Sequence, residues 1–191
     1  MEGSLVADFP ESTYAVLGLV DKVPGSSGYE LASVAGRSFA HFWPISHTLL
    51  YRELRRLADL GWVIATRVDQ VGSPAKWTYK TTATGQKALA DWLARPAPAR
   101  SIFRSGFLLR LFFAYRMDSG QVRALLNDYR AAMRSLCDEF DAIIDKLGPI
   151  ATQQARAGRL TALHGLRTAE ARLAWADEAE ALLGEELHDD A

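Results

Sequence analysis

The sequence predicts a mainly α-helical protein in two parts, with a small β-hairpin in the first part and a long antiparallel helical hairpin in the second. The hydrophobic period changes repeatedly before residue 95, whereas everything after Ser101 keeps a helical period. Pro96 and Pro98 separate the two regions and disfavour helix at the residues before them. We therefore divide the chain into a domain at 11–95, a linking segment with a buried helix at 96–118, and a helical domain at 119–187.

The composition indicates a soluble globular protein. The chain has 191 residues, of which 49% are hydrophobic, and this is enough apolar mass to bury a core. No apolar run reaches the roughly 20 residues that a bilayer span requires. Residues 1–10 contain Glu2 and Asp8 and lack the basic start of a secretory signal, so we expect a cytoplasmic protein without a membrane partner.

The first two helices are bounded by recognisable signals. One opens at Ser12 or Thr13 and ends before Pro24. The next begins near Gly28, because Ser27 and Glu30 have the spacing of a capping box, and fades by about Phe39.

The third helix, between Ser46 and Gly61, has its polarity divided between two sides. Gly61 suits a left-handed C-terminal cap. At 100° per residue, one stripe carries Leu50, Leu54 and Leu57, and the opposite column carries Thr48, Arg52, Arg55 and Asp59. We expect the leucine side to pack and the arginine side to meet solvent or a ligand.

Two β-rich runs follow, at 62–68 and 76–80, and predict a hairpin with a long tip at 69–75. We expect Trp62 and Trp77 to be core residues. Thr82 then caps a fourth helix that contains Leu89, Trp92 and Leu93.

The second part predicts three helices. The apolar segment 102–115 is interpreted as a buried linking helix, and Asp118 or Ser119 caps the long helix that follows it. Gly148-Pro149 ends that helix, and a final helix runs from about Arg159 to Leu183. Apolar residues recur at coiled-coil spacing in both, which predicts a hairpin whose exposed seam needs a partner, most simply a second copy. The expected dimerisation residues are Val122, Leu126, Tyr129, Met133, Leu136, Phe140, Ile143, Leu166 and Leu173.

Three helices followed by a hairpin, with a basic outer side on the third helix, form the layout of a winged helix-turn-helix. The net charge of −1 hides an uneven distribution: residues 11–95 hold ten Lys/Arg against seven Asp/Glu, and residues 96–191 hold twelve against fourteen. Short or planar polar groups on the third helix suit base edges, and basic groups on the hairpin suit phosphates. The expected contacts to double-stranded DNA are Ser46, His47, Thr48, Tyr51, Arg52, Arg55, Arg56, Arg67, Ser73 and Lys76.

Other interpretations of these patterns stay open. The arginines of the third helix could form an ordinary solvated face. Trp92 and Trp175 with nearby aromatic residues could line a pocket at the dimer interface for a small aromatic or hydrophobic effector. A module that only binds protein partners would explain the helical seam but not the hairpin.

An enzyme is the weakest alternative. The four histidines lie apart without ligand spacing, and no phosphate-binding glycine loop is present in the sequence. Cys137 is interpreted as a packed helix residue. We expect no catalytic site, metal or cofactor.

Four sequence strings resemble the PadR family of transcriptional regulators in order and spacing over about residues 14–95. They are Tyr14-Ala15-Val16-Leu17-Gly18-Leu19, Ser27-Gly28-Tyr29-Glu30-Leu31, residues 42–57 with Trp43-Pro44-Ile45-Ser46-His47 and Tyr51-Arg52-Glu53-Leu54, and Tyr79-Lys80-Thr81-Thr82-Ala83-Thr84-Gly85. The second and third helical segments of the C-terminal half, with Trp175, are similar to the dimerisation domain of the subgroup that contains the virulence-gene activator AphA.

Within that family the motif at Ser46-His47 and Tyr51-Arg52-Glu53-Leu54 resembles the AphA subgroup. Phenolic-acid repressors usually have Pro-Gly after the serine, where this chain has His47-Thr48. The resemblance implies a two-fold dimer on a partly palindromic operator, with Ser46, His47, Tyr51 and Arg52 at or near the DNA.

Overall fold

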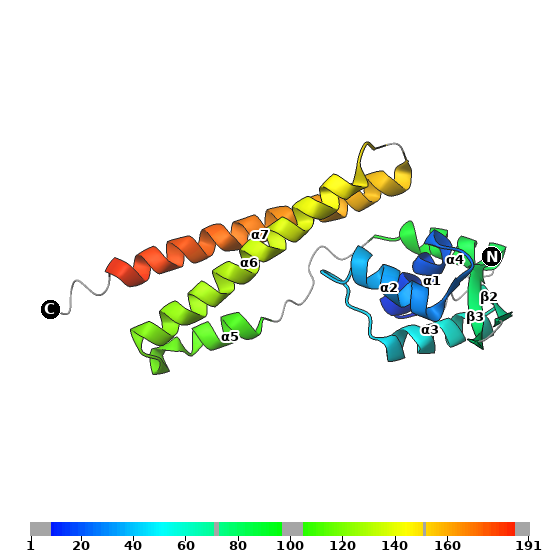
Figure 1. The fold of residues 1–191 in the computed structure, drawn as a ribbon, viewed down its shortest axis with the longest axis horizontal. Helices are drawn as coiled ribbons and strands as arrows, with labels where there is room; N and C mark the ends of the chain where they lie inside the picture. Colours follow the sequence, from blue (N-terminus) through cyan, green and yellow to red (C-terminus); the bar gives the residue numbers. More distant parts are fainter. Residues whose placement is uncertain (1–8, 71–72, 97–104, 151, 186–191) are drawn as a thin grey trace, which may run out of the picture. The chain divides into compact units, whose positions relative to one another are not determined.

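The computed structural model describes residues 9–70, 73–96, 105–150 and 152–185, and these form two compact units that divide between residues 99 and 100. The first unit contains four helices and a three-stranded sheet among its described residues, and the second contains three helices and a short 3-10 turn (Figure 1). None of the helices within the described ranges combines the length and apolar character that a membrane crossing demands.

The first unit is built around three helices, α1 (Glu11–Lys22), α2 (Gly28–Ser38) and α3 (His47–Asp59). Their apolar sides meet in one core, which includes Leu17 of α1, Leu31 of α2 and Leu54 of α3, all fully buried. The capping box predicted at Ser27 and Glu30 is present: the Ser27 hydroxyl accepts from the Glu30 backbone, and the Glu30 carboxylate accepts from the Ser27 backbone at 2.6 Å.

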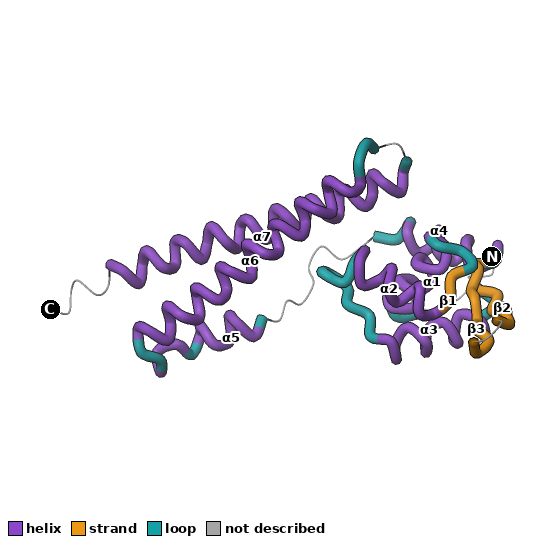
Figure 2. Tube along the Cα trace, viewed as in Figure 1, coloured by secondary structure: helices purple, strands orange, loops and turns teal. Residues whose placement is uncertain are grey.

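The sheet has the order β1-β3-β2 and is antiparallel throughout (Figure 2). Strands β2 (Val63–Gln70) and β3 (Ser73–Thr81) form the expected hairpin, but the strands are longer and the tip is shorter than the sequence predicts. The two-residue strand β1 (Ser26–Ser27) was not predicted; it pairs with Tyr79 and Thr78 of β3. Residues predicted as loop pair across the hairpin because a bulge between Val68 and Gln70 lets the ladder continue.

Helix α4 (Ala83–Leu93) begins at the predicted Thr82 cap, whose hydroxyl accepts from the Gly85 backbone at 3.1 Å and donates to the Gly61 carbonyl at 2.8 Å. Trp92 of α4 stacks on Tyr14 of α1, with ring centroids 5.0 Å apart and planes 5° from parallel. Trp92 is therefore a packing residue of the first unit.

The second unit is a helical hairpin of α6 (Ser119–Leu147) and α7 (Gln153–Glu185), which lie side by side (Figure 1). Asp118 caps α6 as predicted, and its side chain accepts from the Gln121 backbone at 2.8 Å. Helix α7 begins several residues before the predicted start at Arg159. Across the hairpin, Arg130 of α6 forms ion pairs with Asp177, at 2.6 Å, and with Glu180 of α7.

The linking segment differs from the prediction of a buried helix. Its described part contains α5 (Gly106–Phe112) and a 3-10 turn η1 (Ala114–Arg116), and residues 97–104 lie outside the described residues. None of the residues of α5 is buried, and Phe112 is 76% exposed. The segment contacts the hairpin mainly through Phe107, whose ring stacks on Tyr129 of α6. Several of its other apolar side chains are exposed in the single chain, among them Leu109 and Tyr115.

Candidate nucleic-acid interface

Helix α3 presents the division between two sides that its sequence predicts. Ser46 caps its start, where the hydroxyl accepts from the Leu49 backbone at 3.2 Å, and Gly61 just after its end has the left-handed φ of 68°. Leu50, Leu54 and Leu57 are at most 1% exposed. Because this stripe is fixed in the core, the opposite side of α3 is held outward.

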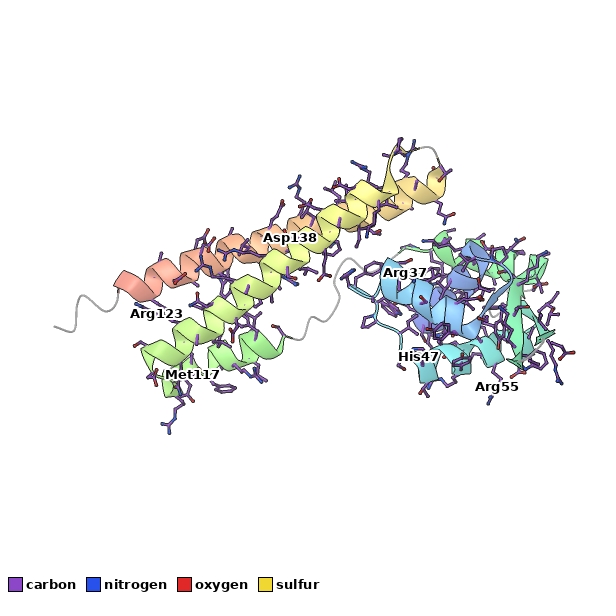
Figure 3. The ribbon with its side chains drawn as sticks, in the orientation of Figure 1. Arg37, His47, Arg55, Met117, Arg123 and Asp138 are labelled. Atoms are coloured by element: carbon purple, nitrogen blue, oxygen red, sulfur yellow. The ribbon has the colours of Figure 1, made fainter. Side chains whose placement is uncertain are left out.

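The outward side carries most of the predicted contact residues. Ser46, His47 and Thr48 are exposed at the start of the helix, and Tyr51, Arg52 and Arg55 are exposed further along. Figure 3 labels His47 at the first turn and Arg55 about two turns later, both on α3. The Arg52 side chain is 65% exposed. These groups form a stripe of donors and acceptors along one side of the helix.

Arg56 departs from this pattern. We expected it to suit the DNA backbone, but its side chain is only 36% exposed and lies on the flank of the helix. Its Nη1 donates to Glu53 Oε2 at 3.1 Å and to the Thr13 hydroxyl at 3.3 Å. The guanidinium is thus engaged by a buried carboxylate and by α1, because residues three apart are neighbours on a helix surface.

The hairpin, or wing, brings two further predicted residues to the surface. Arg67 is 65% exposed and pairs with Asp69 at 3.3 Å. Lys76 is partly exposed, and its Nζ pairs with Glu30 Oε1 of α2 at 3.4 Å. Ser73 pairs with Gln70 at the start of β3, and its side chain is outside the described residues. Both basic residues of the wing that were predicted as DNA contacts, Arg67 and Lys76, therefore already have acidic partners.

A cleft of about 770 Å³ lies between the start of α2, the outer side of α3 and the wing. Its lining includes Tyr29, Tyr51, Arg55, Lys76 and Trp77. Tyr29 is 73% exposed and Trp77 is 52% exposed, which corrects the expectation that Trp77 is a core residue. Sequence reasoning missed this aromatic lining.

The position of Trp77 explains the error. It lies on the same face of β3 as Tyr79 and Thr81, which are half-buried and buried. Trp77 is opposite Arg67, further out along the hairpin, where the strands extend past the helical core. The alternation of side chains along β3 predicts which face of the strand each residue occupies. It does not predict how far along the strand the core extends.

Neighbouring groups determine the protonation states of Glu30 and Tyr79, two residues that line the cleft. The pKa of Glu30 is lowered because the Ser27 backbone N–H, the Ser27 hydroxyl and Lys76 stabilise its carboxylate. The pKa of Tyr79 is raised by burial and by nearby Tyr51, against an opposing effect of Arg55. Glu30 is therefore an anion and Tyr79 a neutral phenol around neutral pH.

The predicted dimerisation residues mostly lie inside the hairpin of a single chain. Val122, Leu126, Phe140 and Leu166 are buried, and Leu136 and Ile143 pack around Phe140 and Leu166. Tyr129 stacks on Phe107, and Met133 and Leu173 are half-buried. The seam was expected to be exposed, and this is wrong because α6 and α7 bury it against each other.

Cys137 borders the same cluster, as predicted for a packed helix residue. Burial raises the pKa of its thiol, and Glu170, Asp141 and Asp138 add to the rise. Within the described residues there is no group of three or more His, Cys, Asp or Glu side chains that could hold a metal ion.

Two family models match the chain, one in each unit. Residues 16–91 match the Transcriptional regulator PadR-like family, and residues 103–184 match the Virulence activator alpha C-term family. Together these ranges contain α3, the wing and the helical hairpin. The two matches support a PadR-family regulator with a C-terminal domain of the virulence-activator type.

Two curated relatives of this PadR-like chain are transcriptional regulators rather than enzymes. A probable transcriptional regulator of Mycobacterium tuberculosis is 45% identical over 76 residues, which cover 39% of this chain and 40% of the relative. The negative transcriptional regulator PadR of Bacillus subtilis is 28% identical over 134 residues, which cover 70% of this chain and 73% of PadR. The match thus spans less than half of the mycobacterial relative.

Solved structures of PadR-like proteins share the fold. Bacillus subtilis PadR in complex with operator DNA superposes with a TM-score of 0.81 at 23% identity, covering 91% of this chain and 99% of that chain. The Vibrio cholerae virulence activator AphA superposes with a TM-score of 0.65 at 26% identity, and the match covers 94% of this chain and 99% of AphA. Bacillus subtilis PadR in complex with p-coumaric acid superposes with a TM-score of 0.73 at 23% identity, and the match covers 90% of this chain and 98% of that chain. The winged helix-turn-helix and the mainly helical class are thereby confirmed.

Proposed function

We propose that this chain is a cytoplasmic, dimeric regulator that binds a partly palindromic DNA operator, with α3 in the major groove and the wing against the phosphate backbone. The observation that carries the proposal is the exposed stripe from Ser46 to Arg55, opposite the three buried leucines. A helix that is fixed by one side and polar on the other fits the width of the major groove. The operator complex of the structural relative PadR supports the same use of the fold.

The proposed contact residues fall into two groups, those that contact base edges and those that contact phosphates. We infer that His47, Thr48 and Arg52, which are exposed on the first turns of α3, contact base edges; an arginine can pair with a guanine through two hydrogen bonds. Arg55 lies later on the helix beside the cleft and suits a phosphate. Arg67 and Lys76 on the wing suit the flanking backbone once they exchange their carboxylate partners for phosphates.

Selection of bound fragments from a genomic DNA pool tests operator binding directly. We expect one motif with two inverted half-sites near one helical turn apart, or a multiple of it. Arg52→Ala should weaken binding to that motif by about 1–3 kcal/mol and relax the preference at one base position in each half-site. Selection that yields no enriched motif, or an Arg52→Ala protein that keeps the parent's preference at every position, would contradict the proposal.

The dimer surface is proposed to lie on the exposed apolar side chains of the second unit rather than on the internal seam. On α5 and η1, Leu109, Phe112 and Tyr115 are 61%, 76% and 78% exposed, and Leu182 of α7 is 62% exposed. Apolar patches of this kind on a folded chain indicate a protein interface. A second copy offers the same patch, and two-fold pairing buries both at once.

Sedimentation of the purified chain tests the dimer. We expect a dimer mass for the parent and a shift to monomer for Phe112→Lys, because a charged side chain there would be buried without a partner. Leu160→Lys is the matched control: Leu160 is 64% exposed on α7, away from α5 in sequence. A Phe112→Lys protein that remains dimeric with the parent's affinity places the interface elsewhere.

A second candidate function is the binding of a small aromatic effector. A pocket of about 550 Å³ is lined by residues of α5, α6 and α7 that include Tyr129, His164, Arg167 and Trp175. Tyr129 and Trp175 meet edge to face at 6.0 Å. Aromatic walls with cationic groups suit an aromatic acid, and the p-coumaric acid complex of PadR supports this class of ligand.

Tryptophan fluorescence tests this candidate. Titration with p-coumaric acid should quench the emission of the parent, and Trp175→Phe should abolish that change while it keeps an aromatic ring in the cluster. Equal quenching in both proteins would mean that the ligand does not use this pocket.

A further inference from the structure

One side chain of α3 is a fully buried acid. Glu53 is 0% exposed, next to the buried Leu54, and both of its carboxylate oxygens have partners. Oε2 accepts the Thr13 hydroxyl of α1 at 2.8 Å and Nη1 of Arg56 at 3.1 Å. Oε1 accepts from Arg52, whose Nε and Nη2 lie at 3.4 and 3.3 Å. Glu53 thus connects the core to an arginine of the outward stripe.

The two carboxylate oxygens of Glu53 bind different partners. Oε2 accepts from Thr13, a fully buried residue of α1, and from Arg56, which also donates to the Thr13 hydroxyl. Oε1 is left to hold the guanidinium of Arg52, whose side chain is still 65% exposed. A buried carboxylate is costly unless it is paired, and an apolar residue of similar size would fill the position without that cost. Packing alone therefore does not explain why a charged side chain occupies position 53.

We propose that Glu53 is a positioning residue for DNA recognition: it holds the exposed guanidinium of Arg52 in one orientation before the operator arrives. This inference rests on the proposed function, because it assumes that α3 reads the DNA. A free arginine samples many rotamers, and ordering it on binding reduces affinity for the correct sequence. An arginine that is already oriented loses less on binding and pairs with one base geometry better than with others.

Arg55 provides the internal comparison. It is exposed on the same helix, and among the described residues no ion pair or hydrogen bond of its guanidinium is recorded. Arg55 therefore attracts phosphate at every sequence, whereas Arg52 discriminates between sequences. Removing the Glu53 charge should affect discrimination and leave general DNA affinity intact.

The first test is Glu53→Gln, which keeps the size of the side chain and removes its charge. The ratio of affinities for the selected operator and for a scrambled duplex should fall about tenfold, because Arg52 loses its fixed orientation. Affinity for the scrambled duplex should stay equal or rise, since one negative charge has gone. An unchanged ratio in a folded Glu53→Gln protein overturns the proposal.

A double-mutant cycle separates positioning from a general structural effect. In an Arg52→Ala background, Glu53→Gln should no longer change the affinity ratio, because the residue it positions is absent. If Glu53→Gln lowers the ratio equally with and without Arg52, its effect is structural and the proposal is wrong. If the parent itself prefers no sequence, the proposed function fails instead, and the two failures are thereby distinguished.

A measurement on the parent chain tests the same contact without any change to Glu53. In nitrogen-15 NMR spectra of the free protein, the Arg52 Nε–H should exchange with water at least several-fold more slowly than the Arg55 Nε–H, with Arg52→Ala and Arg55→Gln giving the assignments. Equal exchange of the two groups would mean that Glu53 does not hold Arg52, and would overturn the proposal.

Discussion

Tyr51 of α3 lies so close to Gly28 of α2 that no β-carbon fits between them. A methyl group on Gly28 would overlap the tyrosine ring and lie 2.9 Å from its hydroxyl oxygen. The contact joins the start of α2 to the outward side of α3, where both residues line the cleft beside the wing.

Gly28→Ala should therefore destabilise the first unit by about 1–3 kcal/mol, as overpacking does, and displace Tyr51. Urea unfolding followed by tryptophan fluorescence measures the change. In a Tyr51→Ala background the same substitution should cost little, because the clashing ring is gone. Equal costs in the two backgrounds would show that Tyr51 is not the obstacle.

Arg55 and Arg56 are adjacent in sequence and should respond differently to substitution. Arg56→Met removes one partner of buried Glu53 and should cost about 2 kcal/mol of stability, less than for a fully buried pair because Arg56 is 36% exposed. Arg55→Gln should leave stability unchanged and reduce the slope of log affinity against log salt by about 1. A lower salt slope for Arg56→Met at unchanged stability would reverse these roles.

Glu30 places a negative charge at the edge of the proposed DNA interface and holds Lys76. Glu30→Gln keeps a side chain that can complete the capping box but releases Lys76 for a phosphate. We expect DNA affinity to rise by about two- to fivefold and the salt slope to steepen by about 1. Glu11→Gln, on an exposed acid of α1 that pairs with no described residue of the cleft, serves as control. Equal gains in both variants would reflect net charge alone.

The Cys137 thiol should react slowly with iodoacetamide. Its raised pKa means that less thiolate is present at pH 8 than in an ordinary cysteine, and the thiolate is the reactive form. The rate should be several-fold higher in urea, and the pH midpoint of the folded protein should lie above that of the unfolded chain. Because the fold favours the protonated thiol, this contribution to stability is lost as pH rises through the thiol range. Equal rates with and without urea would contradict the assignment.

Local signals were sufficient for the starts of several helices in both units and for the buried side of α3. Ser27, Ser46, Thr82 and Asp118 cap the helices that the sequence assigns to them, because a cap depends on residues within one turn. The leucine stripe of α3 is buried as predicted, since helical periodicity alone fixes which side chains share a face.

Errors arose where the outcome depends on residues distant in sequence. Arg56 is held on the flank of α3 because Thr13, some forty residues earlier, forms a site for Glu53 that also engages the Arg56 guanidinium. The apolar seam of α6 meets α7 of the same chain, and periodicity could not distinguish that contact from one with a second copy. The strand β1 is two residues long and is defined only by its pairing with β3.

That last pairing determines the order in which the first unit can assemble. Ser26 and Ser27 find their partners at Tyr79 and Thr78, after α2, α3 and most of the wing have been made. Closing so long a loop costs more chain entropy than forming the helices, each of which needs only near neighbours. A nascent chain that stops before β3 can therefore form neither strand pair of the sheet, so the cleft beside α3 is completed only after β3 has been made.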